Sequence, residues 1–191
     1  GKNEKAITVY QRLLRESPLR KSNSDTHSKL VALYHLVNKV PMVVKELEKM
    51  RKIYLPGGNW YNAHKSNPDR VNAAEKEVEK KLHFYGAKYN NSGIKFKNEA
   101  MLKFASAVYG VYLSAFPKHK NAYEIRFNLA NIYFDLKRYE AASDNYLLVS
   151  KSKVKKPKYH KEAALQAVVA MNKVVSATKY QNEPKPGSLT N

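Results

Sequence analysis

The chain has 191 residues, of which 43% are hydrophobic, so it can bury a core and is not expected to be disordered. Lys and Arg number 35 against 16 Asp and Glu, a net charge of +19 that predicts attraction to acidic partners or surfaces. There is no cysteine, which excludes disulfides, thiolate metal sites and cysteine nucleophiles. No window approaches 18 consecutive apolar residues, so no membrane-spanning segment is predicted.

Apolar residues recur with the helical period along the N-terminal part of the chain. The first three predicted helices cover about 3–16, 24–37 and 40–54, and they are delimited by Pro18, by Asn38 and Pro41, and by Pro56-Gly57-Gly58. The segment from Pro56 to Pro68 holds the only tryptophan and is predicted to be a loop.

Five more helices are predicted in the rest of the chain, at about 69–89, 96–115, 122–136, 138–150 and 159–178. Asn90-Asn91-Ser92-Gly93 is expected to end the first of these. The helices at 122–136 and 138–150 are joined by almost nothing, so they must be antiparallel neighbours. Residues 181–191 are polar and contain proline and glycine, and we expect a disordered tail there. The fold class predicted is all-α.

A repeat with helical-hairpin spacing is visible in residues 123–150. Its packing residues are Leu129, Ala130 and Tyr133 on one helix, then Tyr139, Ala142, Tyr146 and Val149 on the next. The small residue recurs 37 positions apart, from Ala6 to Val43 and from Ala105 to Ala142. This pattern resembles the tetratricopeptide repeat, in which a large–small pair and a tyrosine on the first helix receive a small and an aromatic residue from the second.

The resemblance implies a right-handed α-solenoid of antiparallel hairpins over residues 1–180, with an irregular hairpin at 57–117. The segment opens with a lone second helix and closes with a lone first helix, so we expect a fragment of a longer array. The stretch 122–133, after a helix that ends at Pro117, is similar to the bacterial cell-envelope branch of the family. That branch includes the outer-membrane assembly lipoprotein, the Tol-Pal coordinator and gliding-motility components, and it implies a periplasmic or envelope location.

Motifs for catalysis, cofactors and metals are missing from the sequence. There is no His-Glu-x-x-His, nucleophile elbow or phosphate loop. His27 and His35, eight residues apart on one predicted helix, come nearest to a metal-ligand pair. Glu75, Glu77 and Glu79 interleave with lysines and are expected to form a solvated face. The sequence therefore predicts a protein that is not an enzyme and needs no cofactor or metal.

The concave wall of a tetratricopeptide array is built from the first helix of each hairpin, so the resemblance implies three sets of groove residues. They are Asp25, Ser28, Ala32 and His35, then Glu124, Phe127, Asn131 and Phe134, then Glu162, Leu165, Val169 and Asn172. Each set opens with an acid, which predicts a mildly acidic, partly apolar channel for a peptide with basic and aromatic anchors. The alternative is that Phe127 and Phe134 pack against the neighbouring hairpin.

The predicted function is that of a protein–protein interaction scaffold, which binds a peptide or partner protein in the groove within an envelope or motility complex. The alternative is a basic helical-repeat protein that binds nucleic acid or another acidic polymer, through its 14 tyrosines and the basic run at 151–158. Protein binding is favoured because most tyrosines fall on packing positions and the charge is spread along the chain. The charge also predicts attraction to acidic surfaces such as lipid headgroups.

Overall fold

The computed structural model describes residues 1–182, and within this part every regular element is an α-helix, which confirms the predicted all-α class. The chain divides into two compact units, residues 1–122 and the residues from 123 onward. No helix in the described part is long and apolar enough to cross a membrane. The predicted tail at 181–191 lies outside the described residues, except for Gln181 and Asn182 at the end of the last helix.

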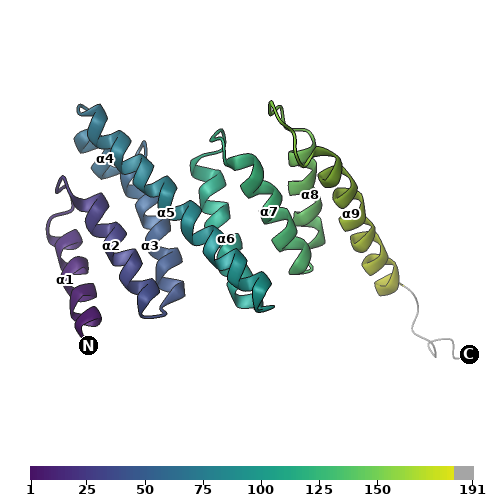
Figure 1. Cartoon of the computed structure of the whole chain (residues 1–191), viewed down its shortest axis with the longest axis horizontal. Helices are drawn as coiled ribbons and strands as arrows, with labels where there is room; N and C mark the ends of the chain where they lie inside the picture. Colours follow the sequence, from purple (N-terminus) through teal and green to yellow (C-terminus); the bar gives the residue numbers. More distant parts are fainter. Residues whose placement is uncertain (183–191) are drawn as a thin grey trace, which may run out of the picture. The chain divides into compact units, whose positions relative to one another are not determined.

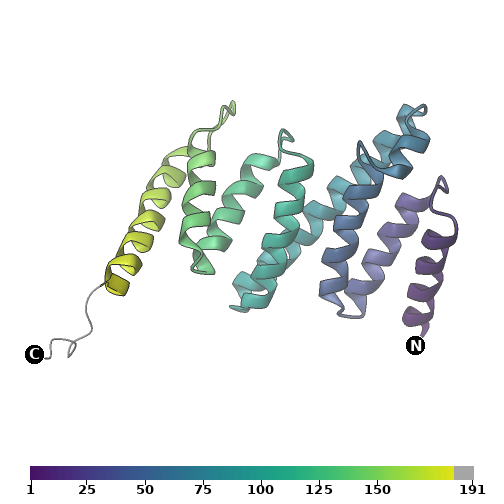
Figure 2. The same cartoon turned by 180° about the vertical axis from the view of Figure 1, so that it is seen from behind.

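Six helices make up the first unit. They are α1 (Lys2–Glu16), α2 (Asn23–Leu36), α3 (Val40–Tyr54), α4 (Asn59–His64), α5 (Pro68–Lys95) and α6 (Glu99–Ala115). The first three lie side by side in chain order, and α5 and α6 form a long hairpin (Figures 1 and 2). α3 contacts both helices of that hairpin, and α2 contacts α5. α2 and α5 are far apart in the sequence, but they lie next to each other in the fold.

The α2–α3 hairpin shows how local sequence sets this arrangement. Asn38 turns the chain with a positive φ of 58°, which asparagine tolerates better than most residues. Pro41 lies in the first turn of α3, where its missing N–H costs no helical hydrogen bond. Val31 and Val43 are completely buried, so the two helices meet through the apolar stripes that the sequence predicts.

The prediction of a loop at 56–68 is wrong, because this segment contains α4. Trp60 is completely buried, and its Nε1 donates a 2.9 Å hydrogen bond to the carbonyl oxygen of Arg20. Its ring stacks on His64 with centroids 4.3 Å apart, and it meets the edge of Tyr54 at 5.2 Å. One turn of helix places residues four positions apart on the same side. Trp60 and His64 therefore lie on one side of α4, and Trp60 holds this helix against α3.

The predicted end of α5 at Asn90–Gly93 is also wrong, since the helix continues to Lys95. Gly93 is buried, and a Cβ atom at this position would lie 2.5 Å from Leu102 Cδ2 and 3.1 Å from the backbone nitrogen of Leu102. The glycine lets α5 and α6 approach closely beside their turn, instead of ending the helix.

We expect Gly93→Ala to lower the free energy of unfolding by about 1–3 kcal/mol, because the added methyl group overpacks this contact. The loss should appear even though alanine is favoured over glycine by about 1 kcal/mol inside a helix. Urea denaturation of both variants measures the effect. Gly110→Ala in α6 is the matched control, because a Cβ there meets nothing within 4 Å, and it should be neutral or stabilising. If the two variants are equally stabilised, the close approach is contradicted.

Glu79 on α5 does not belong to the solvated face that the sequence predicts for it. The Tyr112 hydroxyl of α6 donates a 2.6 Å hydrogen bond to Glu79 Oε1. The same hydroxyl lies 2.7 Å from Nδ1 of His119, and the Asn121 side-chain amide donates to Glu79 Oε1 at 3.3 Å. Burial raises the pKa of Tyr112 above its usual value, and the neighbouring carboxylate raises it further. This cluster ties the chain after α6 to α5.

Three helices make up the described part of the second unit, namely α7 (Ala122–Asp135), α8 (Tyr139–Ser150) and α9 (His160–Asn182). Their bounds lie within a few residues of the predicted ones. The core is built largely from alanines, namely Ala130, Ala142, Ala163, Ala167 and Ala170, together with Phe127, Tyr146 and Val149. The small side chains let the helices approach closely, and the Ser143 hydroxyl donates a 3.0 Å hydrogen bond to the carbonyl oxygen of Ala167.

Candidate functional site

An open pocket of about 420 Å³ lies between α2 and α5. It is lined by Asp25, Ser28, Lys29 and Ala32 of α2 and by Glu77 and Lys81 of α5. The α2 residues share one side of the helix because they are three or four positions apart. Three of the four residues predicted for the first groove set, Asp25, Ser28 and Ala32, therefore line one pocket.

Ser28 is the buried polar member of this pocket. Asp25 and Ala32 are exposed, whereas the Ser28 side chain is buried and its Oγ has no hydrogen-bond partner within the described residues. A buried hydroxyl without a partner costs about 1–3 kcal/mol. A water molecule or a polar group of a ligand that reached Ser28 Oγ would recover that cost, so the pocket favours occupants with hydrogen-bonding groups.

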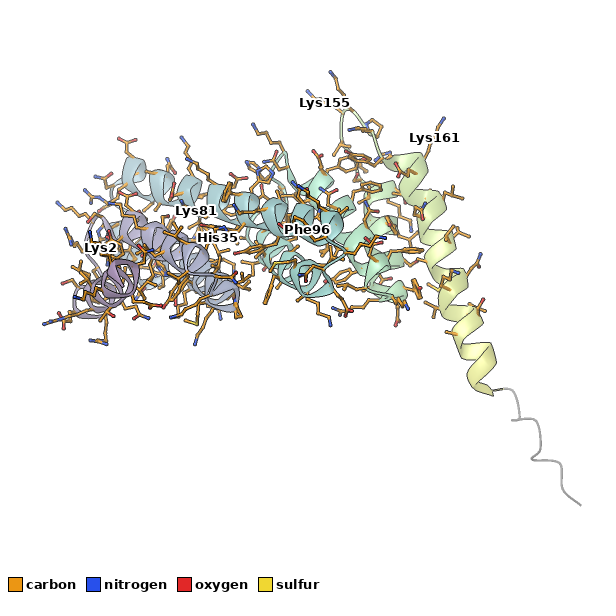
Figure 3. The ribbon with its side chains drawn as sticks, turned by 60° about the horizontal axis from the view of Figure 1, so that its bottom comes forward. Lys2, His35, Lys81, Phe96, Lys155 and Lys161 are labelled. Atoms are coloured by element: carbon orange, nitrogen blue, oxygen red, sulfur yellow. The ribbon has the colours of Figure 1, made fainter. Side chains whose placement is uncertain are left out.

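His35, the fourth residue of the first set, lies further along α2. Its Nδ1 is 3.3 Å from the Tyr89 hydroxyl, and its ring contacts that of Tyr85 at 5.4 Å between centroids. Burial lowers the pKa of His35, and the positive charge of Lys88 lowers it further, so both effects favour the neutral imidazole. Figure 3 shows His35 and Lys81 on neighbouring helices. His35 therefore joins the two helices instead of carrying charge.

The exposed side of α5 beside this pocket combines an aromatic ring with lysines. A second hollow, of about 470 Å³, is lined by Glu79, Lys80, His83, Phe84, Ala87, Lys88 and Asn91. Phe84 is exposed, and the Lys88 ammonium lies 5.6 Å from the centre of its ring. No sequence motif marked Lys81, Phe84 or Lys88, although these residues share one helix face with Glu77.

The expected acidic channel is wrong for the first unit. Glu77 forms a 3.5 Å ion pair with Lys81, so Asp25 is the acid of this pocket that has no ion pair within the described residues. Lys29 and Lys80 form no ion pair within the part of the chain that the structure describes. The error arose because only α2 was assigned to the groove, whereas α5 supplies the facing wall. The combined surface has more basic than acidic side chains.

In the second set, the expectation that Phe127 lines a groove is wrong. Its side chain is only 5% exposed, and its ring stacks on Tyr159 with centroids 4.3 Å apart and planes 9° apart. It also meets the edge of the Tyr146 ring at 5.9 Å. The turn between α8 and α9 brings Tyr159 over Phe127, so the alternative of packing against the neighbouring hairpin describes this residue.

The other members of the second set are also engaged within their unit. The Tyr146 hydroxyl donates a 2.6 Å hydrogen bond to Asn131 Oδ1, and burial raises the pKa of Tyr146 to about 12. Phe134 is half-buried, with its ring 5.3 Å from that of Tyr139. Glu124 is exposed and accepts a 3.4 Å hydrogen bond from the hydroxyl of Tyr159. Asn131 and Phe134 therefore contact residues of their own unit, whereas Glu124 is accessible to solvent.

The third set lies on α9. Glu162, Leu165 and Asn172 are exposed, and Val169 is half-buried. The spacing of these residues places them along the helix. They remain a predicted surface.

Another cavity of the first unit, of about 360 Å³, lies among α1, α2 and α3. Within its lining, His27 Nε2 and Glu46 Oε2 are 2.8 Å apart, and both side chains are buried. His27 Nδ1 is 3.3 Å from the Tyr54 hydroxyl, and Lys49 donates a 2.8 Å hydrogen bond to Glu46. Asn23 Oδ1 is buried without a partner among the described residues. No motif predicted this cluster, because the helix packing alone unites it.

Electrostatics favour a structural role for the His27–Glu46 pair. Burial would raise the pKa of Glu46, but the hydrogen bonds from His27 and Lys49 outweigh this effect, so its pKa lies below the usual carboxyl value. Both ring nitrogens of His27 already have partners, in Glu46 and Tyr54. The lining contains no serine, threonine or cysteine that the pair could activate as a nucleophile.

Metal binding has no candidate cluster in the described part of the chain, where no group of three or more His, Asp or Glu side chains is placed to hold an ion. His27 and His35, the nearest approach in the sequence, make separate hydrogen bonds to Glu46 and Tyr89. The two imidazoles are therefore held by different side chains, His27 by Glu46 and His35 by Tyr89.

Comparisons of the chain with protein-family models, curated proteins and solved structures found no match. The candidate site is therefore selected by its geometry. The pocket between α2 and α5 is preferred because it combines an accessible opening, a buried hydroxyl without a partner and an adjoining surface with an exposed aromatic ring.

Proposed function

We propose that the chain is a scaffold of tetratricopeptide-like hairpins without catalytic activity, and that it binds an extended acidic segment of a partner protein along the α2–α5 surface. We define this surface by Asp25, Ser28, Lys29, Ala32, Lys80, Lys81, Phe84 and Lys88. The repeat assignment is supported by the α7–α8 hairpin, where Ala130 and Ala142 are completely buried. These are the small residues that such a repeat places between its two helices.

The observation that carries the proposal is the pocket containing the Ser28 hydroxyl. An extended peptide backbone presents N–H and C=O groups at regular intervals, and either group could pair with Ser28 Oγ after rotation of the side chain, because the hydroxyl is covered in the unbound chain. The pocket is open and lies between two helices, which suits a chain segment better than an enclosed small molecule. A backbone contact of this kind would hold many sequences, so side chains must supply the selectivity.

The α5 side chains supply that selectivity. Lys80 and Lys88 favour carboxylates in the partner, and the exposed Phe84 ring offers an apolar anchor between them. The sequence alone predicted a peptide with basic anchors, and the facing wall from α5 reverses the sign of the preferred charge. The partner class proposed is thus an acidic segment with at least one aromatic or aliphatic side chain.

We expect Lys88→Glu to weaken binding of such peptides by about 10-fold or more, since it replaces attraction with repulsion beside the anchor. Acidic peptides selected from a displayed random library against the full chain at about 150 mM salt provide the probes. Fluorescence anisotropy then measures their affinity for each variant. Lys65→Glu is the matched control, because Lys65 is exposed beyond α4 and outside the α2–α5 surface. Equal losses in both variants would show that net charge alone attracts the peptides.

Nucleic acid is the alternative ligand, and the turn before α9 is where it would bind. Lys151, Lys153, Lys155 and Lys156 are exposed there, and the Lys158 ammonium lies 4.8 Å from the centre of the Tyr159 ring. Figure 3 shows Lys155 and Lys161 on the same side of this turn. Binding of this kind should weaken steeply with salt, because each neutralised phosphate releases counterions. Peptide binding through Phe84 should depend on salt less.

A further inference from the structure

The last described helix, α9, exposes a stripe of large apolar side chains. The exposed fractions are 63% for Leu165, 58% for Val168, 40% for Met171 and 60% for Val175. These residues are three or four positions apart and so share one side of the helix. Another side, with Ala163, Ala167 and Ala170, is buried in the core of the second unit. An exposed stripe of this kind marks a surface that can pack against another helix.

The neighbouring helix α7 shows what covers such a stripe. Leu129, Ala130 and Tyr133 of α7 correspond to Ala167, Val168 and Met171 of α9, with a constant separation of 38 residues. On α7, Ala130 is buried and Tyr133 is partly buried in one cluster with residues of α8. Those residues are Ala142, Tyr146 and Val149. Val168 and Met171 thus occupy on α9 the positions that α8 covers on α7.

The first helix, α1, carries the residues that α8 uses for this purpose. Ala6, Tyr10 and Leu13 have the same spacing as Ala142, Tyr146 and Val149. The next position in each helix faces the following helix in the chain. On α1 this position is Ile7, which is buried in a unit where α1 packs on α2. On α8 it is Ser143, whose hydroxyl bonds to Ala167 of α9.

The side of α1 with Ala6, Tyr10 and Leu13 remains accessible. All three residues are only partly buried, and Val9 between them is exposed. Two helices of the chain thus carry the two halves of one helix–helix contact, and each half faces solvent in part.

We infer that α1 of one copy of the chain packs on the apolar stripe of α9 in a second copy, as α8 packs on α7 within the chain. This self-association is independent of peptide binding at the α2–α5 surface. The two surfaces in the contact differ, so a pair of copies keeps one free α1 and one free α9, and assembly continues into open chains. The charge of +19 on each copy opposes assembly, and salt should strengthen it by screening that repulsion.

Sedimentation velocity of the full chain, at increasing concentration and in low and high salt, tests the inference. The wild-type chain should form larger species as concentration and salt rise. Ala6→Arg and Val168→Arg should each weaken assembly by about 10-fold or more, because each puts a charge into an apolar contact. Val175→Arg repeats the test at the far end of the stripe. Leu148→Arg is the control, since Leu148 is equally exposed on α8 but lies outside both surfaces.

Mixing the two disrupted variants identifies the geometry of the contact. The Val168→Arg chain keeps an intact α1, and the Ala6→Arg chain keeps an intact α9, so an equimolar mixture should form dimers and stop there. Circular dichroism confirms that each variant is folded. A wild-type chain that stays monomeric throughout would overturn the inference. Full assembly of the Ala6→Arg chain alone would also overturn it, because that result would indicate pairing of α9 with α9. A loss of assembly in the Leu148→Arg chain would overturn it as well.

Discussion

Phe127→Ala is expected to lower the free energy of unfolding of the second unit by about 3–5 kcal/mol, the usual cost of removing a buried aromatic side chain. The ring is 5% exposed and stacks on Tyr159, so its loss opens a cavity and removes an aromatic contact. The measurement is amide hydrogen exchange, followed separately for peptides from α7, α8 and α9. A local probe is needed because a chain with two units need not unfold in one step.

The control for this experiment is Leu148→Ala, which removes an exposed apolar side chain from α8 and should change stability by less than about 0.5 kcal/mol. Phe127→Ala should leave the affinity of acidic peptides for the α2–α5 surface unchanged, since Phe127 lies in the other unit. A stable variant with weaker peptide binding would contradict the core position and restore the groove role predicted from the sequence.

Local patterns in the sequence were sufficient to predict most of the helices. α3 spans Val40–Tyr54 as expected, because its apolar period, its early proline and the Pro-Gly-Gly after it are all local signals. The errors occur where a distant contact decides the outcome. α4 depends on burial of Trp60 against Tyr54 and Arg20, and α5 passes through Gly93 because Leu102 of α6 packs there. Periodicity cannot reveal such contacts.

The candidate site was predicted only in part, for a similar reason. The repeat frame grouped Asp25, Ser28 and Ala32, which line one pocket, since residues three or four apart share a face whatever the helix packs against. It did not identify Lys81 or Phe84, because α5 fits no regular repeat spacing. Burial of a given side chain also depends on the turns between helices, which is why the frame could not separate exposed groove positions from buried ones.

The buried pair of His27 and Glu46 gives the second large expected effect. His27→Leu should lower the free energy of unfolding of the first unit by about 3–5 kcal/mol, because it leaves the Glu46 carboxylate buried without its closest buried partner. Leucine fills much of the space of the imidazole, so loss of volume is a minor cause. Replacing both residues by leucine should cost less than His27→Leu alone, since the carboxylate is then removed as well. Urea denaturation of the single and double variants measures these differences.

The same pair predicts how stability depends on pH. The pKa of Glu46 is lower in the folded chain than its usual value, so the unfolded chain binds the proton more readily. The stabilisation by Glu46 is therefore complete above the usual carboxyl pKa of about 4.3 and is lost as the pH falls through the lower pKa of the folded state. The stability difference between the wild-type chain and the double leucine variant should accordingly shift in favour of the variant as the pH falls from 6 to about 3. Glu48 also has a lowered pKa, beside Arg51, but it is present in both chains and cancels in the comparison. A difference that stays constant over this range would show that Glu46 is not stabilised as a carboxylate by His27.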